Sequence, residues 1–184
     1  YYKQLLIVHS PLILIFLFLI LSNETSQKSY NKEIVIEVNQ LANPINSLNK
    51  KNIEEKIKKL INTSNADYII FAENNFPYLV NINTLNTLNT FIKENKKVII
   101  GATTIKDGDY YNSFFLLEKN KIQNFDKKIL VPFGEFLPFR KYLNFMEIIS
   151  GSIDFKKGNT ERIITTADNL KILPIICYEI VFDK

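Results

Sequence analysis

The sequence predicts a layered α/β domain, because short apolar runs typical of strands alternate with amphipathic segments typical of helices. The apolar runs end in polar residues or turns, and the helical segments carry isoleucine and leucine at helical spacing. A hydrophobic content of 46% in 184 residues is enough for one core of ordinary size. Periodicity predicts helices packed on a sheet and does not specify the number of layers.

The N-terminal stretch differs in composition from the rest of the chain. Residues 5–21 are apolar apart from His9 and Ser10, which approaches the roughly 20 residues that span a bilayer. We therefore expect a transmembrane helix within residues 1–21, at the end of an N-terminal membrane domain, and a polar linker at residues 22–31. A signal peptide is the alternative, because a lysine precedes the apolar run, but no small-residue cleavage pattern follows it.

The remaining elements are predicted within a domain at residues 32–184. Two amphipathic helices are expected, at residues 45–62 with Asn52 as the cap and at residues 79–95. The motif Lys-Asp-Gly-Asp at residues 106–109 predicts a hairpin turn. Apolar or alternating runs predict strands at residues 33–38, 68–71, 97–102, 111–118, 122–125 and 162–165, and in the run from Ile172 to Cys177.

Residues 139–149 have two interpretations. They form a broad apolar face beside Arg140 and Lys141. A helix of the hydrophobic core has this pattern. So does an amphipathic arm that lies in the headgroup region of a membrane.

Charge and cysteine content exclude several classes of function. The net charge of +4 comes from lysine pairs scattered along the chain, which predicts a solvated face, and no nucleic-acid-binding motif accompanies it. A single cysteine, Cys177, excludes an internal disulfide and a multi-cysteine metal site. The only histidine, His9, lies in the apolar N-terminal stretch, so we expect no Cys-His dyad.

Three reactive side chains stand at the ends of separate apolar segments: Glu73, Lys127 and Cys177. A carboxylate, an ammonium and a thiol at one rim of a sheet could together perform acyl transfer, with the carboxylate as base, the ammonium as oxyanion donor and the thiol as nucleophile. The alternative for Cys177 is a buried apolar filler, since free cysteine is among the most buried residue types.

The motifs around these residues resemble a known family. Glu73 with Pro77 four residues later, Lys127 in "KKILVPFGEFLP" and Cys177 in "ICYEIVF" resemble the Glu-Lys-Cys triad of the nitrilase, or carbon-nitrogen hydrolase, superfamily. "LVPFGEFLP", "CYEIVF", "YYNSFFLLE" and "DFKKGN" are closer to its membrane-bound branch, the apolipoprotein N-acyltransferases. The resemblance covers about residues 30 to 184, and "FAENNFP" departs from the usual sequence around the glutamate.

The resemblance implies more than the residues alone. It implies a four-layer αββα sandwich that continues beyond residue 184 and lacks its last part here. Glu73, Lys127 and Cys177 would be catalytic, and no metal or cofactor would take part. Glu135 would support Lys127, although an exposed turn carboxylate is the alternative. Tyr178 and Glu179 would form the elbow that positions the nucleophile, or would simply face water.

By the same resemblance, the protein moves an acyl chain from a membrane phospholipid, through a thioester, to the N-terminal diacylglyceryl-cysteine of apolipoproteins. It would be a multi-pass protein of the bacterial cytoplasmic (inner) membrane, with its catalytic domain facing the periplasm. One alternative is an amidase of the same superfamily that hydrolyses a small amide. Another is a non-catalytic domain tethered to the membrane.

Overall fold

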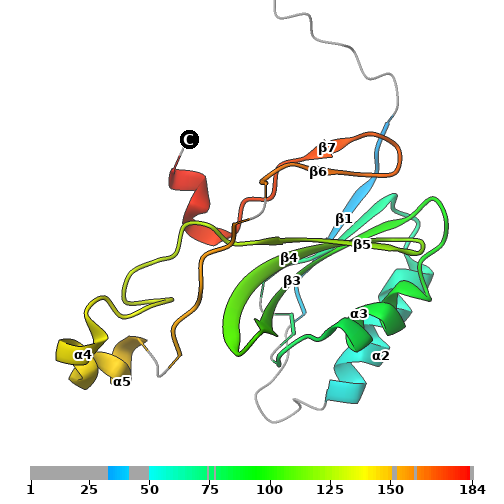
Figure 1. Ribbon diagram of the computed structural model, residues 1–184. Helices are drawn as coiled ribbons and strands as arrows, with labels where there is room; N and C mark the ends of the chain where they lie inside the picture. Colours follow the sequence, from blue (N-terminus) through cyan, green and yellow to red (C-terminus); the bar gives the residue numbers. More distant parts are fainter. Residues whose placement is uncertain are drawn as a thin grey trace, which may run out of the picture. The chain divides into compact units, whose positions relative to one another are not determined.

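The computed structural model describes residues 33–41, 50–73, 75–76, 78–150, 153–159 and 161–182 (Figure 1). The chain divides into two units, Tyr1–Glu33 and Ile34–Lys184, and the fold described below is that of the second. The transmembrane helix and the linker predicted for residues 1–31 lie outside the described residues. Among the residues described, no helix has the length and apolar character needed to cross a membrane.

The second unit has a mixed α/β fold, as the sequence predicts. Its main sheet has the strand order β1-β2-β3-β4-β5, and β6 and β7 form a separate two-stranded sheet. β1, β2 and β3 are parallel, whereas β3, β4 and β5 are antiparallel neighbours. The strands are β1 (Ile36–Asn39), β2 (Tyr68–Phe71), β3 (Lys97–Lys106), β4 (Asp109–Glu118), β5 (Lys121–Asp126), β6 (Ile164–Thr165) and β7 (Lys171–Ile172).

The parallel strands are connected by two helices, α2 (Lys50–Thr63) and α3 (Ile82–Asn89). α2 buries isoleucines spaced four residues apart, which is the spacing of one helix face. Asn52 lies inside this helix, so the prediction that it is the cap was wrong. α3 is shorter than predicted: the Asn81 side chain caps it by accepting a hydrogen bond from the Thr84 N–H at 2.9 Å.

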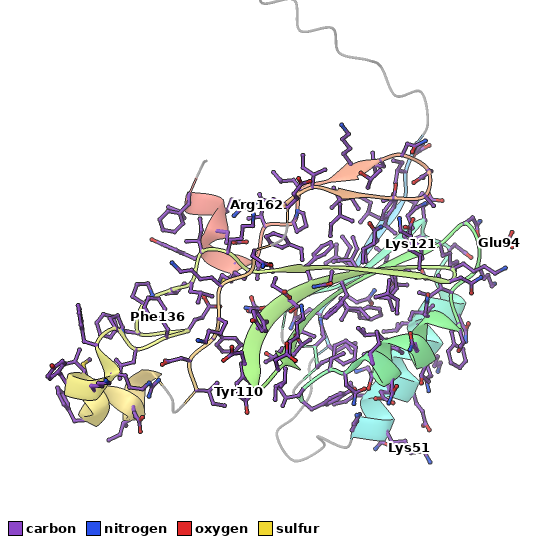
Figure 2. The ribbon with its side chains drawn as sticks, viewed as in Figure 1. Lys51, Glu94, Tyr110, Lys121, Phe136 and Arg162 are labelled. Atoms are coloured by element: carbon purple, nitrogen blue, oxygen red, sulfur yellow. The ribbon has the colours of Figure 1, made fainter. Side chains whose placement is uncertain are left out.

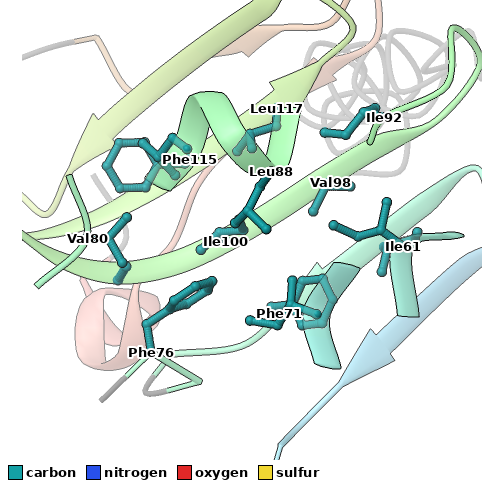
Figure 3. Close-up of a cluster of buried hydrophobic side chains, with 14 of the residues drawn as sticks. Ile61, Phe71, Phe76, Val80, Leu88, Ile92, Val98, Ile100, Phe115 and Leu117 are labelled. Carbon is teal, nitrogen blue, oxygen red and sulfur yellow. The ribbon is translucent and has the colours of Figure 1, made fainter. Parts of the chain in front are cut away.

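Both faces of the main sheet are covered. One set of alternating strand residues packs against α2 and α3 to form the larger core (Figure 3). The other set faces the β6–β7 hairpin, and Figure 1 shows the helices and this hairpin on opposite sides of the sheet. Burial on both faces accounts for the continuous apolar sequences of β2 and of residues 98–102 in β3.

The β3–β4 hairpin is confirmed, and β3 is longer than predicted because it pairs with β4 as far as Lys106. The turn residues Asp107 and Gly108 both have positive φ angles, as a tight hairpin requires. In contrast, the predicted strand from Ile172 to Cys177 was wrong beyond Ile172. Pro174 has no N–H to donate to a strand partner, which interrupts pairing within the run.

Residues 139–149 do not form one helix. They form three short turns, α4 (Arg140–Leu143), the 3-10 helix η2 (Asn144–Met146) and α5 (Glu147–Ser150). The large side chains of this segment are exposed: Phe139 by 78%, Tyr142 by 81%, Phe145 by 71% and Ile148 by 95%. The interpretation as a core helix was therefore wrong, and the amphipathic arm remains a prediction.

Candidate active site

Glu73 lies just beyond the carboxyl end of β2, at the edge of the sheet. The turn that holds it is organised by Asn75, a fully buried residue. The Asn75 side chain accepts a hydrogen bond from the Leu41 N–H and donates one to the Ala72 carbonyl oxygen at 2.7 Å. β3 approaches this turn closely, because a Cβ atom added at Gly101 would lie only 3.1 Å from the Glu73 backbone nitrogen. The position of Glu73 is thus fixed by backbone packing.

Lys127 and Glu135 form a largely buried ion pair. The Lys127 side chain is 1% exposed, the Glu135 side chain is 13% exposed, and the Nζ–Oε2 distance is 2.8 Å. Lys127 directly follows β5, and its N–H donates to the Asn112 carbonyl oxygen at 2.8 Å. The second interaction of Glu135 Oε2 is with the Val131 N–H, at 2.9 Å. A buried ammonium requires such a partner, so the interpretation of Glu135 as an exposed turn carboxylate was wrong.

Asn112 of β4 joins Glu73 to this ion pair. Its Nδ2 donates to Glu73 Oε1 at 2.7 Å and to Glu135 Oε1 at 3.1 Å. Both acceptors are carboxylate oxygens, so only the amide NH₂ group can satisfy them. Glu73, Lys127 and Glu135 therefore meet in one hydrogen-bonded group that is built from three separate segments. Sequence reasoning missed Asn112, although the polar pair Asn112-Ser113 visibly interrupts an apolar strand.

Cys177 begins a 3-10 helix, η3 (Cys177–Val181). Its φ angle is +52°, in the left-handed region that residues other than glycine seldom adopt. The side chain is exposed, which excludes the interpretation of Cys177 as buried filler. The thiol makes no hydrogen bond to another described residue, so it is not bonded to Glu73 or Lys127. The structure thus presents an exposed thiol on a sharp turn.

Glu179 connects that turn to the segment that follows Lys127. Its side chain is fully buried, and it pairs with Arg162 at 3.2 Å; Figure 2 shows Arg162 beside η3. Its carboxylate also accepts three backbone N–H groups: Lys128 at 2.9 Å, Ile129 at 3.1 Å and Ile176 at 3.0 Å. The interpretation of Glu179 as facing water was therefore wrong. Tyr178 is half exposed and packs edge-on against Phe182, with ring centroids 5.5 Å apart.

The described part of the chain contains no cluster of three or more His, Cys, Asp or Glu side chains placed to hold a metal ion. The described residues supply two neighbouring carboxylates, one buried ammonium and one exposed thiol. Carboxylates accept protons, an ammonium stabilises a developing oxyanion, and a thiolate attacks carbonyl carbon. Groups of these kinds can together perform acyl transfer.

Two solved structures that are similar to this chain are named as carbon-nitrogen hydrolases. The chain aligns with XC1258 from Xanthomonas campestris at 11% identity and a TM-score of 0.48, covering 82% of this chain and 54% of that one. It aligns with the carbon-nitrogen hydrolase from Helicobacter pylori G27 at 18% identity and a TM-score of 0.41, covering 68% and 45%.

The chain is homologous to the apolipoprotein N-acyltransferases. It is 36% identical to that of Rickettsia typhi over 144 residues, which is 71% of this chain and 27% of the relative. It is also 36% identical to that of Wigglesworthia glossinidia brevipalpis over 154 residues, covering 72% and 29%. No family model matches the chain. The chain spans about a quarter of the length of these curated relatives, and the resemblance that the motifs predict is confirmed.

Proposed function

We propose that this protein is an apolipoprotein N-acyltransferase, which moves an acyl chain from a phospholipid to the N-terminal diacylglyceryl-cysteine amine of apolipoproteins. The observation that supports this most strongly is the hydrogen-bonded group of Glu73, Asn112, Glu135 and Lys127. The names of the sequence relatives support the same reaction.

In the first half-reaction, the thiol of Cys177 attacks the ester carbonyl carbon of the phospholipid. Glu73 accepts the thiol proton, and the ammonium of Lys127 stabilises the tetrahedral oxyanion. The bond between carbonyl carbon and ester oxygen then breaks. The leaving lysophospholipid alcohol takes the proton from Glu73, and the acyl group remains on Cys177 as a thioester.

In the second half-reaction, the α-amine of the diacylglyceryl-cysteine attacks the thioester carbonyl. Glu73 accepts a proton from the attacking nitrogen, and the bond between carbonyl carbon and sulfur breaks. The thiolate of Cys177 recovers that proton, and an amide has formed on the lipoprotein. Because the first product leaves before the acceptor reacts, the kinetics should be ping-pong.

Three residues serve as supporting groups in this proposal. Glu135 holds the Lys127 ammonium in place through the buried ion pair. Glu179 fixes the turn that carries Cys177 against the backbone after Lys127. Tyr178, half exposed beside the thiol, borders the place where the acceptor arrives.

The membrane setting is part of the proposal. The arm formed by α4, η2 and α5 exposes aromatic and aliphatic side chains that a lipid surface would cover. We propose a transmembrane helix within residues 1–21, a linker at residues 22–31 and, at residues 32–184, a catalytic domain of the αββα type. The catalytic domain would face the periplasm of a bacterium, at its inner membrane.

An amidase that uses the same residues and water as the acceptor is the second candidate. The exposure of Cys177 favours it, because water can reach a thioester formed there. In that case acyl release would not require an added amine. A lipoprotein acyltransferase would instead retain the thioester until the amine is supplied.

The test is complementation of a strain that lacks its own enzyme, with full-length protein carrying Glu73→Ala, Lys127→Ala or Cys177→Ala. Each variant is expected to fail, with normal abundance in the membrane fraction. Lys128→Ala is the matched control, because the neighbouring side chain is not assigned a role, and it should restore growth. Growth restored by any of the three site variants would contradict the proposal.

A further inference from the structure

Residues 153–159 form a strap across the segments that carry the candidate site. Figure 2 labels Tyr110, at the end of β4 that the strap contacts. Three backbone N–H groups of the strap donate to carbonyl oxygens of these segments: Phe155 to Glu135 at 2.7 Å, Lys156 to Tyr110 at 2.7 Å and Gly158 to Lys127 at 2.9 Å. The strap thus contacts the backbone of both members of the buried ion pair.

Gly158 lies at the point where the strap touches the sheet. A Cβ atom added there would be 2.2 Å from the Asp126 carbonyl oxygen and 2.7 Å from its carbonyl carbon. Both are backbone atoms, which cannot rotate away as a side chain does. Any side chain at position 158 must therefore separate the strap from the end of β5. The chain has only five glycines among its 184 residues, so this contact uses a residue type that is scarce here.

The two residues of the ion pair have different backbone partners, one on the sheet and one on the strap. Lys127 is attached to the sheet, because its N–H donates to the Asn112 carbonyl oxygen at 2.8 Å. The backbone of Glu135 is attached to the strap through Phe155. The Glu135 side chain is also held by Asn112 and Val131. The separation at Gly158 adds to these contacts and influences how closely the Glu135 carboxylate approaches the Lys127 ammonium.

The other end of the strap is anchored by Asp154. Its carboxylate accepts a hydrogen bond from the Leu137 N–H at 2.8 Å and pairs with both Nε and Nη2 of Arg140. The Arg140 guanidinium lowers the pKa of Asp154, which keeps this carboxylate charged. The strap is therefore bonded to Lys127, which precedes Glu135 in the sequence, and to Leu137 and Arg140, which follow it.

We propose that residues 153–159 are a positioning device for the candidate site, and that Gly158 is a positioning residue that keeps Glu135 within ion-pair distance of Lys127. The role of the strap in holding Glu135 near Lys127 rests on the backbone contacts described above. Its consequence for turnover rests on the proposed function, in which the Lys127 ammonium stabilises the oxyanion.

The test compares Gly158→Ala with Gly134→Ala in the full-length enzyme. Gly134 is the matched control, since a Cβ there would meet atoms of Val131 no closer than 3.5 Å, which is an ordinary contact. We expect Gly158→Ala to lower kcat about 100-fold, as loss of one oxyanion donor does, with KM changed less than about threefold. Gly134→Ala should behave as the unsubstituted enzyme.

A double substitution separates positioning from general destabilisation. In a Glu135→Ala background, Gly158→Ala should cause no further loss of kcat, because both changes act by removing the same ion-pair partner from the Lys127 ammonium. An additive loss, or an unchanged kcat for Gly158→Ala alone, would overturn the inference. If Gly158→Ala does not fold, Asp154→Ala loosens the other end of the strap and should lower kcat at least tenfold; an unaltered kcat would have the same consequence.

A crystal structure of Gly158→Ala tests the strap even if the enzyme transfers no acyl group. The distance from Lys127 Nζ to Glu135 Oε2 should increase from 2.8 Å to beyond about 4 Å, where a close hydrogen-bonded ion pair is lost. A distance that stays at 2.8 Å would refute the strap. Absence of acyl transfer in the unsubstituted enzyme would refute only the proposed function.

Discussion

Replacing Glu179 with alanine should remove the hydrogen bonds that join the turn at Cys177 to the backbone of Lys128 and Ile129. The Glu179 carboxylate is fully buried, accepts three backbone N–H groups and pairs with Arg162. Alanine would leave the three N–H groups and the guanidinium without this acceptor. Each buried donor left unpaired costs about 1–3 kcal/mol, and removing one partner of a buried ion pair costs about 3–5 kcal/mol.

These costs are not additive, so we take about 3–5 kcal/mol as the expected change in the free energy of local opening. A tenfold change in an equilibrium corresponds to about 1.4 kcal/mol, so the amides should exchange with deuterium about 10²- to 4 × 10³-fold faster. Hydrogen exchange measured by mass spectrometry on peptides containing Lys128 and Ile176 reports this directly. Glu161→Ala, an exposed glutamate in the same segment as Arg162, is the control and should leave the exchange unchanged. Acceleration below tenfold in both peptides would refute the role assigned to Glu179.

Three further predictions follow from other parts of the structure. Asn112→Asp should lower kcat more than Asn112→Ala in an acyl-transfer assay, because both variants lose the amide donor and aspartate also places a third carboxylate between Glu73 and Glu135; equal losses would contradict this, since the added charge would then have no effect. Phe139→Asp combined with Phe145→Asp should abolish turnover of vesicle phospholipid while the thermal unfolding midpoint changes little, because both side chains are more than 70% exposed. A large drop in the midpoint would show that this segment is part of the hydrophobic core. Because hydrogen bonds from Arg140 lower the pKa of Asp154, the stabilisation from this carboxylate should be complete above its ordinary pKa of 3.8 and be lost as the pH falls below that value. The amide NMR signal of Leu137, which donates to Asp154, should shift as Asp154 titrates, and this shift should be absent in Asp154→Asn. A titration midpoint above pH 3.8 would contradict the lowered pKa of Asp154.

Several features could be predicted from the sequence because they depend on local chemistry. The spacing of isoleucines in α2 and the Asp-Gly turn between β3 and β4 specify their conformations without reference to distant residues. The end of β2 places Glu73 at the sheet edge for a similar reason, since an apolar run gives way to a turn there.

Other features could not be predicted, because they arise where distant segments meet. Asn112 contacts two carboxylates 39 and 23 residues away in sequence, and no local pattern specifies such a meeting. The burial of Glu179 likewise depends on the backbone 50 residues before it. The missing strand before Cys177 is different: Pro174 was visible in the sequence, and its lack of an N–H outweighed the apolar pattern around it.

The central claim is that Cys177 carries the acyl group. Full-length protein mixed with phospholipid vesicles and no amine acceptor should gain the mass of one acyl chain, and proteolysis should locate that chain on the peptide containing Cys177. Hydroxylamine should remove it, as expected for a thioester, and Cys177→Ala should not acquire it. An acyl chain found on another residue, or acyl transfer that continues in Cys177→Ala, would contradict the account.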